Sequence, residues 1–332
     1  MAISNDVLSS TLRILLEEEV DNLFKATPLL DQMKKKGQID FYDGGQKLDV
    51  PLILAEHSSI TQLSNGYEPV NLAVQDSLRN ASYNWCDFVA PIVITEKEEL
   101  SNKGERAIVS IAEARMKSVM GLLQREFEKQ VIAGNSAVLS ELNTLNGIGS
   151  SAGFLEGATF GLQTNTVGGI AKSAFPNEWQ NQVVDSSSQF STGNATGIKD
   201  LTDLYIAAQL RTPGAGAPDL ILCSADMYAG YKKLLYANER FINESALDGG
   251  KLSLAFHGAQ MYVDPFLPIN NISAMALNTN YMRLAMDSDA NFKMSDFETI
   301  SGYCARSAKI YTRVQLYAEH LASQGILLNA ET

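Results

Sequence analysis

The sequence is poor in the residues that most often form disulfides or bind metals. It has three cysteines and three histidines in 332 residues. An odd number of widely spaced cysteines does not predict a disulfide framework, so we expect reduced thiols. No two of the histidines have the spacing of a metal site, and we expect no metal and no cofactor.

Charged residues are also scarce, at 19% of the chain against an ordinary share of about 25%. Asp and Glu number 38 and Lys and Arg 26, which gives a formal net charge of -12. Nucleic-acid-binding surfaces need clustered Lys and Arg, so this composition argues against a surface that binds the phosphate backbone of a nucleic acid. The plentiful uncharged polar residues instead suit large contacts between proteins.

Long apolar runs are missing as well. No window reaches the roughly 18 apolar residues of a membrane-spanning helix, and the first twenty residues lack the pattern of a signal peptide. We therefore expect a protein that is made and kept in the cytosol, with no membrane partner. Its 45% hydrophobic content is enough for at least one substantial core, and its length indicates two or three domains.

Apolar residues at steps of three and four predict helices in the first half of the chain. One runs from Asn5 to about Lys25, and a shorter one follows to Lys36. The longest is predicted over residues 102–133, where Asn102 can cap the helix and Glu105 stands three residues later. At 1.5 Å per residue it would be about 48 Å long, which suits the girder of an extended domain.

A long hairpin is predicted between these helices. Apolar residues alternate at strand period from Leu48 to Leu54 and return from Ala81 to Ile94, with a change of phase near Asp87. The loop between the strands, residues 56–76, is longer than ordinary turns. Two strands rarely stabilise themselves, so the hairpin requires support from outside, such as another subunit.

The second half of the chain mixes helices with strands. We predict a helix near 198–208, a buried strand from Asp219 to Cys223, and a helix capped by Ser224 that extends to Tyr236. The segments that follow have strand character: AQMYVDP, AMALN, YMRLAM, FKMSDF and AKIYTRVQLYAEHL. The fold class is α+β, with the long helix early and the sheet late.

These elements, in this order, resemble the major capsid proteins of tailed bacteriophages, the Hong Kong ninety-seven type of fold. Local strings are similar too: TVGGI at Thr166 to Ile170, then Phe175, Pro176, Trp179 and Asn181, then PDLILCSADMYAGYKKL, GAQMYVDP and ALNTNYMRLAM. The resemblance implies an N-terminal arm, an extended two-stranded loop, a spine helix in a peripheral domain, and an axial domain. The corresponding segments are 1–39 for the arm, 40–97 for the loop, 98–197 for the peripheral domain, 198–290 for the axial domain and 291–332 for the returning C-terminal strands.

By the same resemblance, the chain is a structural protein and not an enzyme. Many copies would form the icosahedral shell of a virion, enclosing double-stranded DNA without binding it specifically. Assembly would take place in the host cytoplasm, with portal, scaffold and decoration proteins as further partners. We expect contacts between subunits at residues of the hairpin and at two tryptophans: Glu56, His57, Gln62, Tyr67, Arg79, Trp85 and Trp179.

Two family features have no counterpart in this sequence. The N-terminal arm is short, so we expect any scaffold to be a separate protein or to be processed away. Some family members cross-link their subunits, but neither Lys47 nor Lys97 matches such a site, and we predict no self-catalysed bond.

Three alternatives remain at this point. An encapsulin-type compartment shares the fold but encloses a cargo enzyme. A serine hydrolase is suggested by the Gly-x-Ser-x-Gly pattern around Ser151, although the flanking segments do not predict the required strand and helix. A calcium loop is suggested by the spacing of Asp287, Asp289, Asn291 and Glu298, but Phe292 stands where such loops have glycine, so a polar turn is favoured.

Overall fold

The computed structural model describes residues 5–54, 62, 66, 77–101, 105–134, 142–148, 153–187, 196–212, 214, 216–237 and 253–330. The chain divides into two compact units, and each unit combines separate stretches of sequence. The first unit comprises Met1–Gln46, Asn84–Leu145 and Met282–Tyr317, and the second comprises Lys47–Tyr83, Asn146–Tyr281 and Ala318–Thr332. These units cut across the five consecutive segments expected from the sequence, because strand pairing joins residues that are far apart in the chain.

The first unit contains helices and a six-stranded mixed sheet. Its helices are α1 (Asn5–Ala26), α2 (Pro28–Lys35), α3 (Glu96–Ser101) and α4 (Glu105–Ile132). Its strands are β1 (Ile39–Tyr42), β4 (Cys86–Thr95), β12 (Met282–Asp287), β13 (Lys293–Met294), β14 (Glu298–Thr299) and β15 (Ala305–Ala318).

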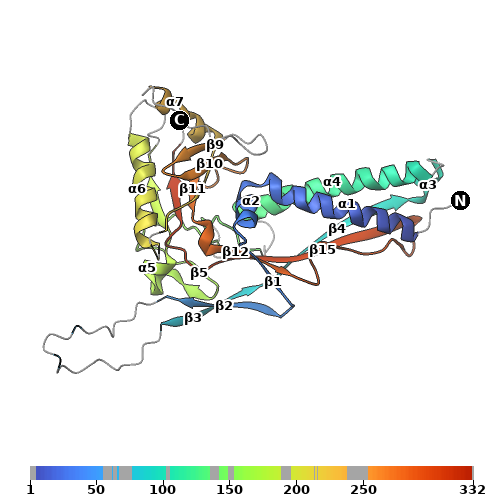
Figure 1. The fold of residues 1–332 in the computed structure, drawn as a ribbon, viewed down its shortest axis with the longest axis horizontal. Coiled ribbons are helices and arrows are strands. Elements are labelled where there is room, and N and C mark those ends of the chain that lie inside the picture. The colour runs from blue at the N-terminus through green and yellow to red at the C-terminus, as the bar shows by residue number, and fades with distance from the viewer. Residues whose placement is uncertain are drawn as a thin grey trace. The chain divides into compact units, whose positions relative to one another are not determined.

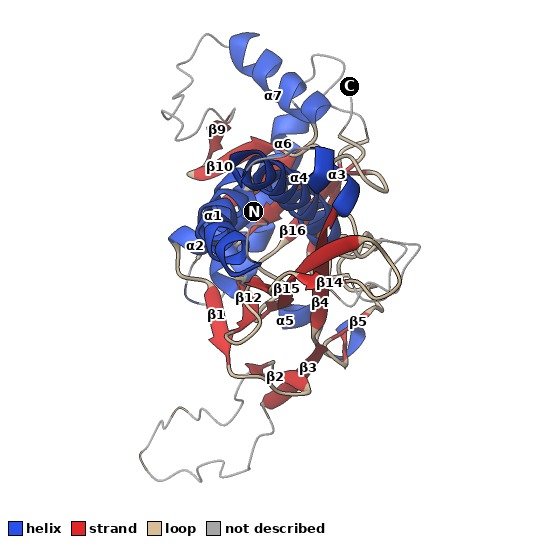
Figure 2. Ribbon diagram, turned by 90° about the vertical axis from the view of Figure 1, so that its right-hand side faces the viewer, coloured by secondary structure: helices blue, strands red, loops and turns tan. Residues whose placement is uncertain are grey.

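The long strand β15 organises the sheet of this unit. It pairs antiparallel with β4 over ten residues, from Ala305 opposite Thr95 to Val314 opposite Cys86. Strands β12, β13 and β14 also pair with β15, and β1 joins β12 in parallel. Helix α4 packs against β4, where the rings of Phe88 and Phe127 meet edge to face at 5.6 Å. Helix α1 lies beside α4, as Figures 1 and 2 show.

The second unit is built around a six-stranded sheet in the order β7-β16-β11-β8-β10-β9. The strands of this sheet are β7 (Gln182–Asp185), β8 (Leu220–Cys223), β9 (Ser253–Phe256), β10 (Ala259–Val263), β11 (Ile272–Leu277) and β16 (Gly325–Leu328). Two small two-stranded sheets belong to the same unit: β2 (Lys47–Ile53) with β3 (Leu78–Asn84), and β5 (Thr166–Val167) with β6 (Ile170–Ala171). Its helices are η1 (Lys172–Ala174), α5 (Pro176–Trp179), α6 (Thr196–Arg211), α7 (Ala225–Ala237) and η3 (Thr279–Tyr281).

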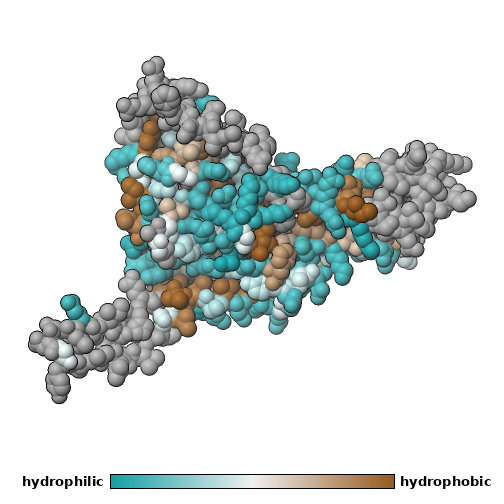
Figure 3. Space-filling view, in the orientation of Figure 1, coloured by the Kyte–Doolittle hydropathy of each residue, from teal (hydrophilic) through white to brown (hydrophobic). Residues whose placement is uncertain are grey.

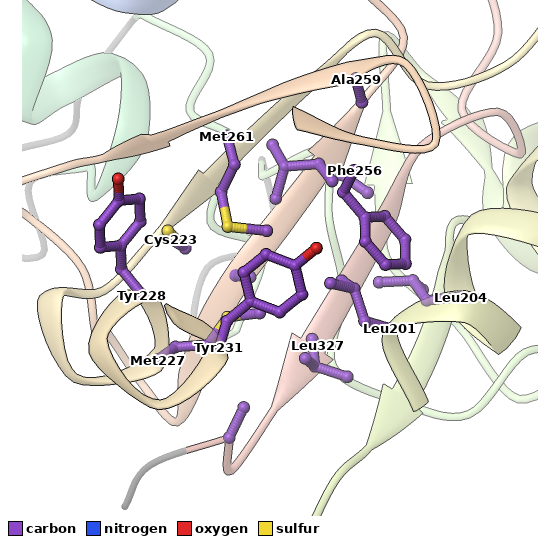
Figure 4. Close-up of a cluster of buried hydrophobic side chains, with 14 of the residues drawn as sticks. Leu201, Leu204, Cys223, Met227, Tyr228, Tyr231, Phe256, Ala259, Met261 and Leu327 are labelled. Carbon is purple, nitrogen blue, oxygen red and sulfur yellow. The ribbon is translucent and has the colours of Figure 1, made fainter. Parts of the chain in front are cut away.

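The core of the second unit lies between this sheet and the helices α6 and α7. Figure 4 shows Leu201 and Leu204 from α6 and Met227 and Tyr231 from α7 among side chains from the strands. All strand residues of β8 and β11 are buried, which is expected for central strands covered on both faces. The predicted cap of α7 is confirmed, because Met227 N donates to Ser224 Oγ at 3.3 Å.

The helix and strand predictions fit the structure closely at most positions. The first two helices are confirmed, and α4 covers the described part of the predicted long helix; Asn102 lies outside the described residues. The alternation in β2 and the change of phase in the return strand are confirmed by burial, with the change at Trp85 and Cys86. No helix in the described part of the chain is long and apolar enough to cross a membrane.

Two strand predictions were wrong. The predicted return strand is two strands, of which only β3 pairs with β2, while β4 pairs with β15 in the first unit. Segment FKMSDF forms only the two-residue strand β13, because Met294 pairs with Ile310 and the chain then turns toward β14. In both places a long-range partner, β15, decided the pairing.

Candidate functional site

The ribbon of β2 and β3 presents an apolar surface to solvent. One face holds the buried alternating residues predicted from the sequence. The opposite face carries Ile53 and Leu78, which are 72% and 61% exposed. Leu54 N donates to Ser77 O at 3.1 Å, so these two residues lie at the same end of the ribbon. Figure 3 shows hydrophobic surface near the point where the ribbon meets the grey residues. Large aliphatic side chains exposed together on a narrow ribbon favour contact with another protein.

The buried face of the ribbon is held by the turn between β5 and β6. Ser82 N donates to Gly168 O at 2.9 Å. Gly168 has a φ of 57°, and a Cβ atom there would lie 2.8 Å from Ala81 Cβ and 2.9 Å from Tyr83 Cζ. The glycine-rich string TVGGI therefore allows a close approach that a larger residue would prevent. This contact fixes the ribbon at its base while the face with Ile53 and Leu78 stays open.

The residues predicted to contact other subunits have different surroundings. Gln62 and Arg79 are exposed, and the Arg79 guanidinium lies 5.9 Å from the centre of the Phe175 ring. Glu56, His57 and Tyr67 lie outside the described residues. Gln62 and Arg79 thus remain available as contact residues, and Arg79 has an aromatic neighbour that orients it.

The two tryptophans are packed inside the chain. Trp179 on α5 has no exposed surface, and Trp85 is buried with its ring edge to face with Tyr42 at 6.3 Å. Neither indole N–H has a hydrogen-bond acceptor among the described residues. The side chain of Trp179 therefore offers no surface to a neighbouring subunit, and the expectation that it forms such a contact was wrong. Its size serves the core of its own unit.

A fully buried lysine organises the segment that contains the TVGGI string. Lys172 Nζ donates to Phe154 O at 2.7 Å, to Asn181 Oδ1 at 3.1 Å and to Gln163 Oε1 at 3.4 Å. A carboxylate oxygen of Glu156 lies 3.9 Å from the same nitrogen. Glu156 in turn accepts hydrogen bonds from the backbone N–H groups of Thr164 and Asn165. One ammonium group thus holds together a loop that has little regular structure of its own.

Burial lowers the pKa of Lys172 to about 8, and the charge of Glu156 partly opposes this shift. The cluster was not identified from the sequence. A signal was present, since Glu156 and Lys172 are the only charged residues between Glu141 and Glu178. An isolated pair of opposite charges in a glycine-rich segment is compatible with a buried ion pair.

Asp264, after β10, is a second buried charge in the same unit. Its side chain accepts a hydrogen bond from Phe266 N at 2.8 Å through Oδ1, while Oδ2 has no partner among the described residues. Burial raises the pKa of Asp264 to about 6. Among the described residues no basic side chain contributes to its pKa in favour of the charged form, so this group opposes folding at neutral pH.

Neither the Gly-x-Ser-x-Gly motif nor the calcium-loop motif corresponds to a site among the described residues. Ser151 lies outside the described residues. Asp287 accepts a hydrogen bond from Asp289 N at 3.0 Å and lies 3.7 Å from Arg313, so its carboxylate already has partners. Phe292 has a φ of 47°, and Glu298 lies on β14. Within the described ranges, no three His, Cys, Asp or Glu side chains are grouped as metal ligands would be.

A groove of about 640 Å³ lies in the first unit, along α1. Its charged lining residues include Arg13, which donates to Asp296 Oδ1 at 2.8 Å. The other lining residues are Leu16, Glu17, Val20, Asn291, Phe292, Lys293 and Met294. This mixture contains no nucleophile and base within reach of each other, so the groove does not suggest a catalytic site.

Comparisons with known proteins give the fold. No protein-family model matches the sequence, and no curated protein matches it. Solved structures do match. The capsid chain of Cyanophage A-1(L) has a TM-score of 0.62 at 14% identity, with 88% of this chain and 90% of that chain covered. The capsid of an empty GTA particle has a TM-score of 0.58 at 13% identity, with 89% and 95% covered.

An encapsulin has a similar fold. The holo-SrpI encapsulin complex from Synechococcus elongatus PCC 7942 contains a chain with a TM-score of 0.53 at 11% identity, and the match covers 92% of this chain and 88% of that one. The capsid of Myoviridae phage XM1 has a TM-score of 0.55 at 11% identity. These matches extend over nearly the whole of each chain, and they confirm the expected fold class. The chain has the Hong Kong ninety-seven type fold of tailed-phage major capsid proteins.

Proposed function

We propose that this chain is the structural major capsid protein of a tailed bacteriophage, and that many copies assemble into an icosahedral shell around the phage DNA. The observation that carries this proposal is the fold, which extends over 88% to 89% of this chain in the matches to the cyanophage, GTA and XM1 capsids. A match of this extent concerns the whole architecture and not a single shared domain. The role is structural and requires no catalytic residue and no cofactor.

The surface of the second unit supports assembly. The ribbon of β2 and β3 leaves Ile53 and Leu78 exposed on one face, while the other face is fixed by contacts within its own unit. A closed shell made from one chain uses the same surface patches in every copy. The apolar patch on the ribbon of β2 and β3 is suited to such a contact, because the opposite face of the ribbon is fixed within its own unit. We propose that a neighbouring subunit covers this face, and that Gln62 and Arg79 are further contacts with a neighbour. Glu56, His57 and Tyr67 remain proposed contacts on the same loop.

The charge of the chain fits the enclosure of DNA without specific binding. A net charge of -12 leaves few clusters of Lys and Arg to bind phosphate. In this proposal an acidic inner face repels the packaged DNA and lets it slide. The protein resides in the virion after assembly in the host cytoplasm, where portal, scaffold and decoration proteins are its further partners. A lumen that mapped as strongly basic would contradict the repulsive role of the inner face.

An encapsulin-type compartment is the second candidate, and the match to the SrpI chain favours it. The two candidates share one fold and differ in what the shell encloses. Particles purified from the native source separate them by their contents. Nuclease-resistant DNA inside the particles is the result expected for a phage head, and an enclosed enzyme without DNA is the result expected for an encapsulin.

Electron microscopy of the purified full-length protein tests the proposal directly. We expect closed, regular shells, formed either by the protein alone or after a scaffold protein is added. The mass distribution in solution, measured on the same sample, should show large assemblies in place of a monomer. A protein that stays monomeric under both conditions would contradict a capsid role.

A further inference from the structure

Strand β4 is an edge strand of the sheet in the first unit. It pairs with β15 along all ten of its residues, from Cys86 to Thr95, and the described strands place no partner on its other side. A strand of this length with a free edge is a template on which another chain can add a strand. The groups that face this edge therefore decide whether such pairing occurs.

The hydrogen bonds of the sheet identify which residues face the edge. Glu96 N donates to Cys304 O at 3.0 Å, just beyond the last pair of the ladder. In an antiparallel pair, alternate residues direct both backbone groups toward the partner strand. Residues 94, 92, 90, 88 and 86 therefore bond to β15. Residues 95, 93, 91, 89 and 87 direct their backbone groups to the open edge.

Three of these five outward positions are blocked. Pro91 has no N–H and cannot donate to an incoming strand. The carbonyl oxygen of Val93 accepts a hydrogen bond from the Arg115 guanidinium of α4. The N–H of Thr95 donates to Glu98 Oε2 at 3.1 Å, and the Thr95 hydroxyl donates to the same oxygen at 2.8 Å.

The two capping side chains also hold each other. Arg115 forms an ion pair with Glu98 Oε1, so the carboxylate contacts both Thr95 and the guanidinium. The hydrogen bonds from Thr95 and the nearby Arg115 charge keep the pKa of Glu98 below its ordinary value. Glu98 therefore stays ionised well into the acid range, and the cap stays in place at neutral pH.

An unblocked edge here would be prone to association. The segment from Phe88 to Thr95 reads FVAPIVIT and contains no charged residue. Val89 and Val93 are 54% and 37% exposed on the outer face of the strand. Uncharged, β-branched edge strands are the segments that associate into extended sheets. Only Asp87 and Val89 keep both outward backbone groups without a block, and two positions are too few for a stable added strand.

We propose that Pro91, Arg115 and Glu98 form a block that prevents a second copy of this chain from adding a strand to the edge of β4. The block excludes open-ended sheet growth, so copies of the chain associate through other surfaces. This inference goes beyond the proposed shell function and does not depend on it. A monomeric protein with this fold would need the same protection.

The test uses the full chain and a fluorescent peptide with the sequence of residues 86–95, in which serine replaces Cys86. Arg115→Met removes the cap on Val93 while keeping an unbranched side chain, and Lys117→Met removes a positive charge from an exposed position of the same helix. Fluorescence anisotropy reports binding of the peptide. We expect the variant that combines Arg115→Met with Pro91→Val to bind the peptide at least about tenfold more tightly than the wild type, because it frees the Val93 carbonyl and adds an N–H group at position 91. Lys117→Met should bind as the wild type does.

Two further measurements distinguish strand pairing from unfolding. A peptide whose backbone is N-methylated on both edges cannot pair, and it should lose the binding gained by the variant. Adding Val89→Pro to the variant that carries Arg115→Met and Pro91→Val should remove the gain as well, because it puts a proline back on the open edge. Two results would overturn the proposal. One is that the unmodified and N-methylated peptides bind equally to the variant with Arg115→Met and Pro91→Val. The other is that this variant and the wild type bind the unmodified peptide equally. Neither result bears on shell formation.

Discussion

Asp264 is a side chain whose protonation state bears on the stability of the second unit. It is 1% exposed, and burial raises its pKa to about 6 from 3.8. The folded protein therefore holds a proton that the unfolded chain releases between about pH 4 and pH 6. The stabilisation by this group is complete at about pH 4 and is lost as the pH rises through 6.

Replacing Asp264 with asparagine removes that pH dependence. We expect Asp264→Asn to increase the free energy of unfolding at pH 7 by an amount on the order of 2–3 kcal/mol, and therefore to raise the unfolding temperature. Near pH 4 we expect little effect. Thermal unfolding at a series of pH values measures the difference. Asp226→Asn, at an exposed position of α7, is the matched control and should show no pH-dependent gain. A gain that is the same at pH 4 and pH 7 would show that charge is not the cause.

Lys172 is expected to be needed for the stability of its loop. Lys172→Met keeps most of the volume but leaves Phe154 O, Asn181 Oδ1 and the Glu156 carboxylate without their buried donor. Breaking a buried ion pair in this way costs about 3–5 kcal/mol, and we expect a loss of that size in denaturant unfolding. The control is Lys199→Met, since Lys199 forms an exposed ion pair with Asp203. A loss no larger than that of the control would contradict the role of the cluster.

At the scale of elements, the turn between β5 and β6 tests how closely the ribbon is held. Gly168→Ala introduces a Cβ within 3 Å of Ala81 and Tyr83 at a φ of 57°, so it adds overlap to backbone strain. Gly169 has a φ of 79° but nothing within 4 Å, so Gly169→Ala adds the strain alone. We expect Gly168→Ala to cost about 1–3 kcal/mol more than Gly169→Ala in equilibrium unfolding. Equal losses would mean that the ribbon moves away from the turn without cost.

Local patterns predicted the elements well where each element depends on its own sequence. The alternation of β2 places Leu48, Val50 and Leu52 on one buried face, and Ser224 caps α7 as expected. The exposed apolar face of the ribbon was not predicted, although Ile53 indicates it. An apolar residue at an outward-facing position of a strand is typical of a surface that another molecule covers. The different partners of β3 and β4 were harder to predict, since the change of phase near Asp87 indicates a break in the alternation and not a change of partner strand.

At the scale of the molecule, the exposed face of the ribbon is where we expect assembly to be most sensitive. Replacing both Ile53 and Leu78 with aspartate places charge on a face that a neighbour covers in the proposed shell. We expect a folded protein that no longer forms shells in electron microscopy, with an unfolding midpoint close to that of the wild type because both positions are exposed. Lys47→Gln, also at an exposed position of β2, is the control and should still assemble. Normal shells from the double variant would exclude this face as a subunit contact.

The sequence by itself determined the helices, most strands, the α+β class and the resemblance that led to the fold, because these depend on local periodicity and on the order of the elements. Tertiary structure alone decided which strands pair, so β4 joins β15 and β3 joins β2. It also decided that Trp179 is core, that Lys172 is a buried charge, and that the edge of β4 is capped by Arg115 and Glu98. Each of these depends on residues that are distant in the chain, and a local pattern carries no information about its long-range partner.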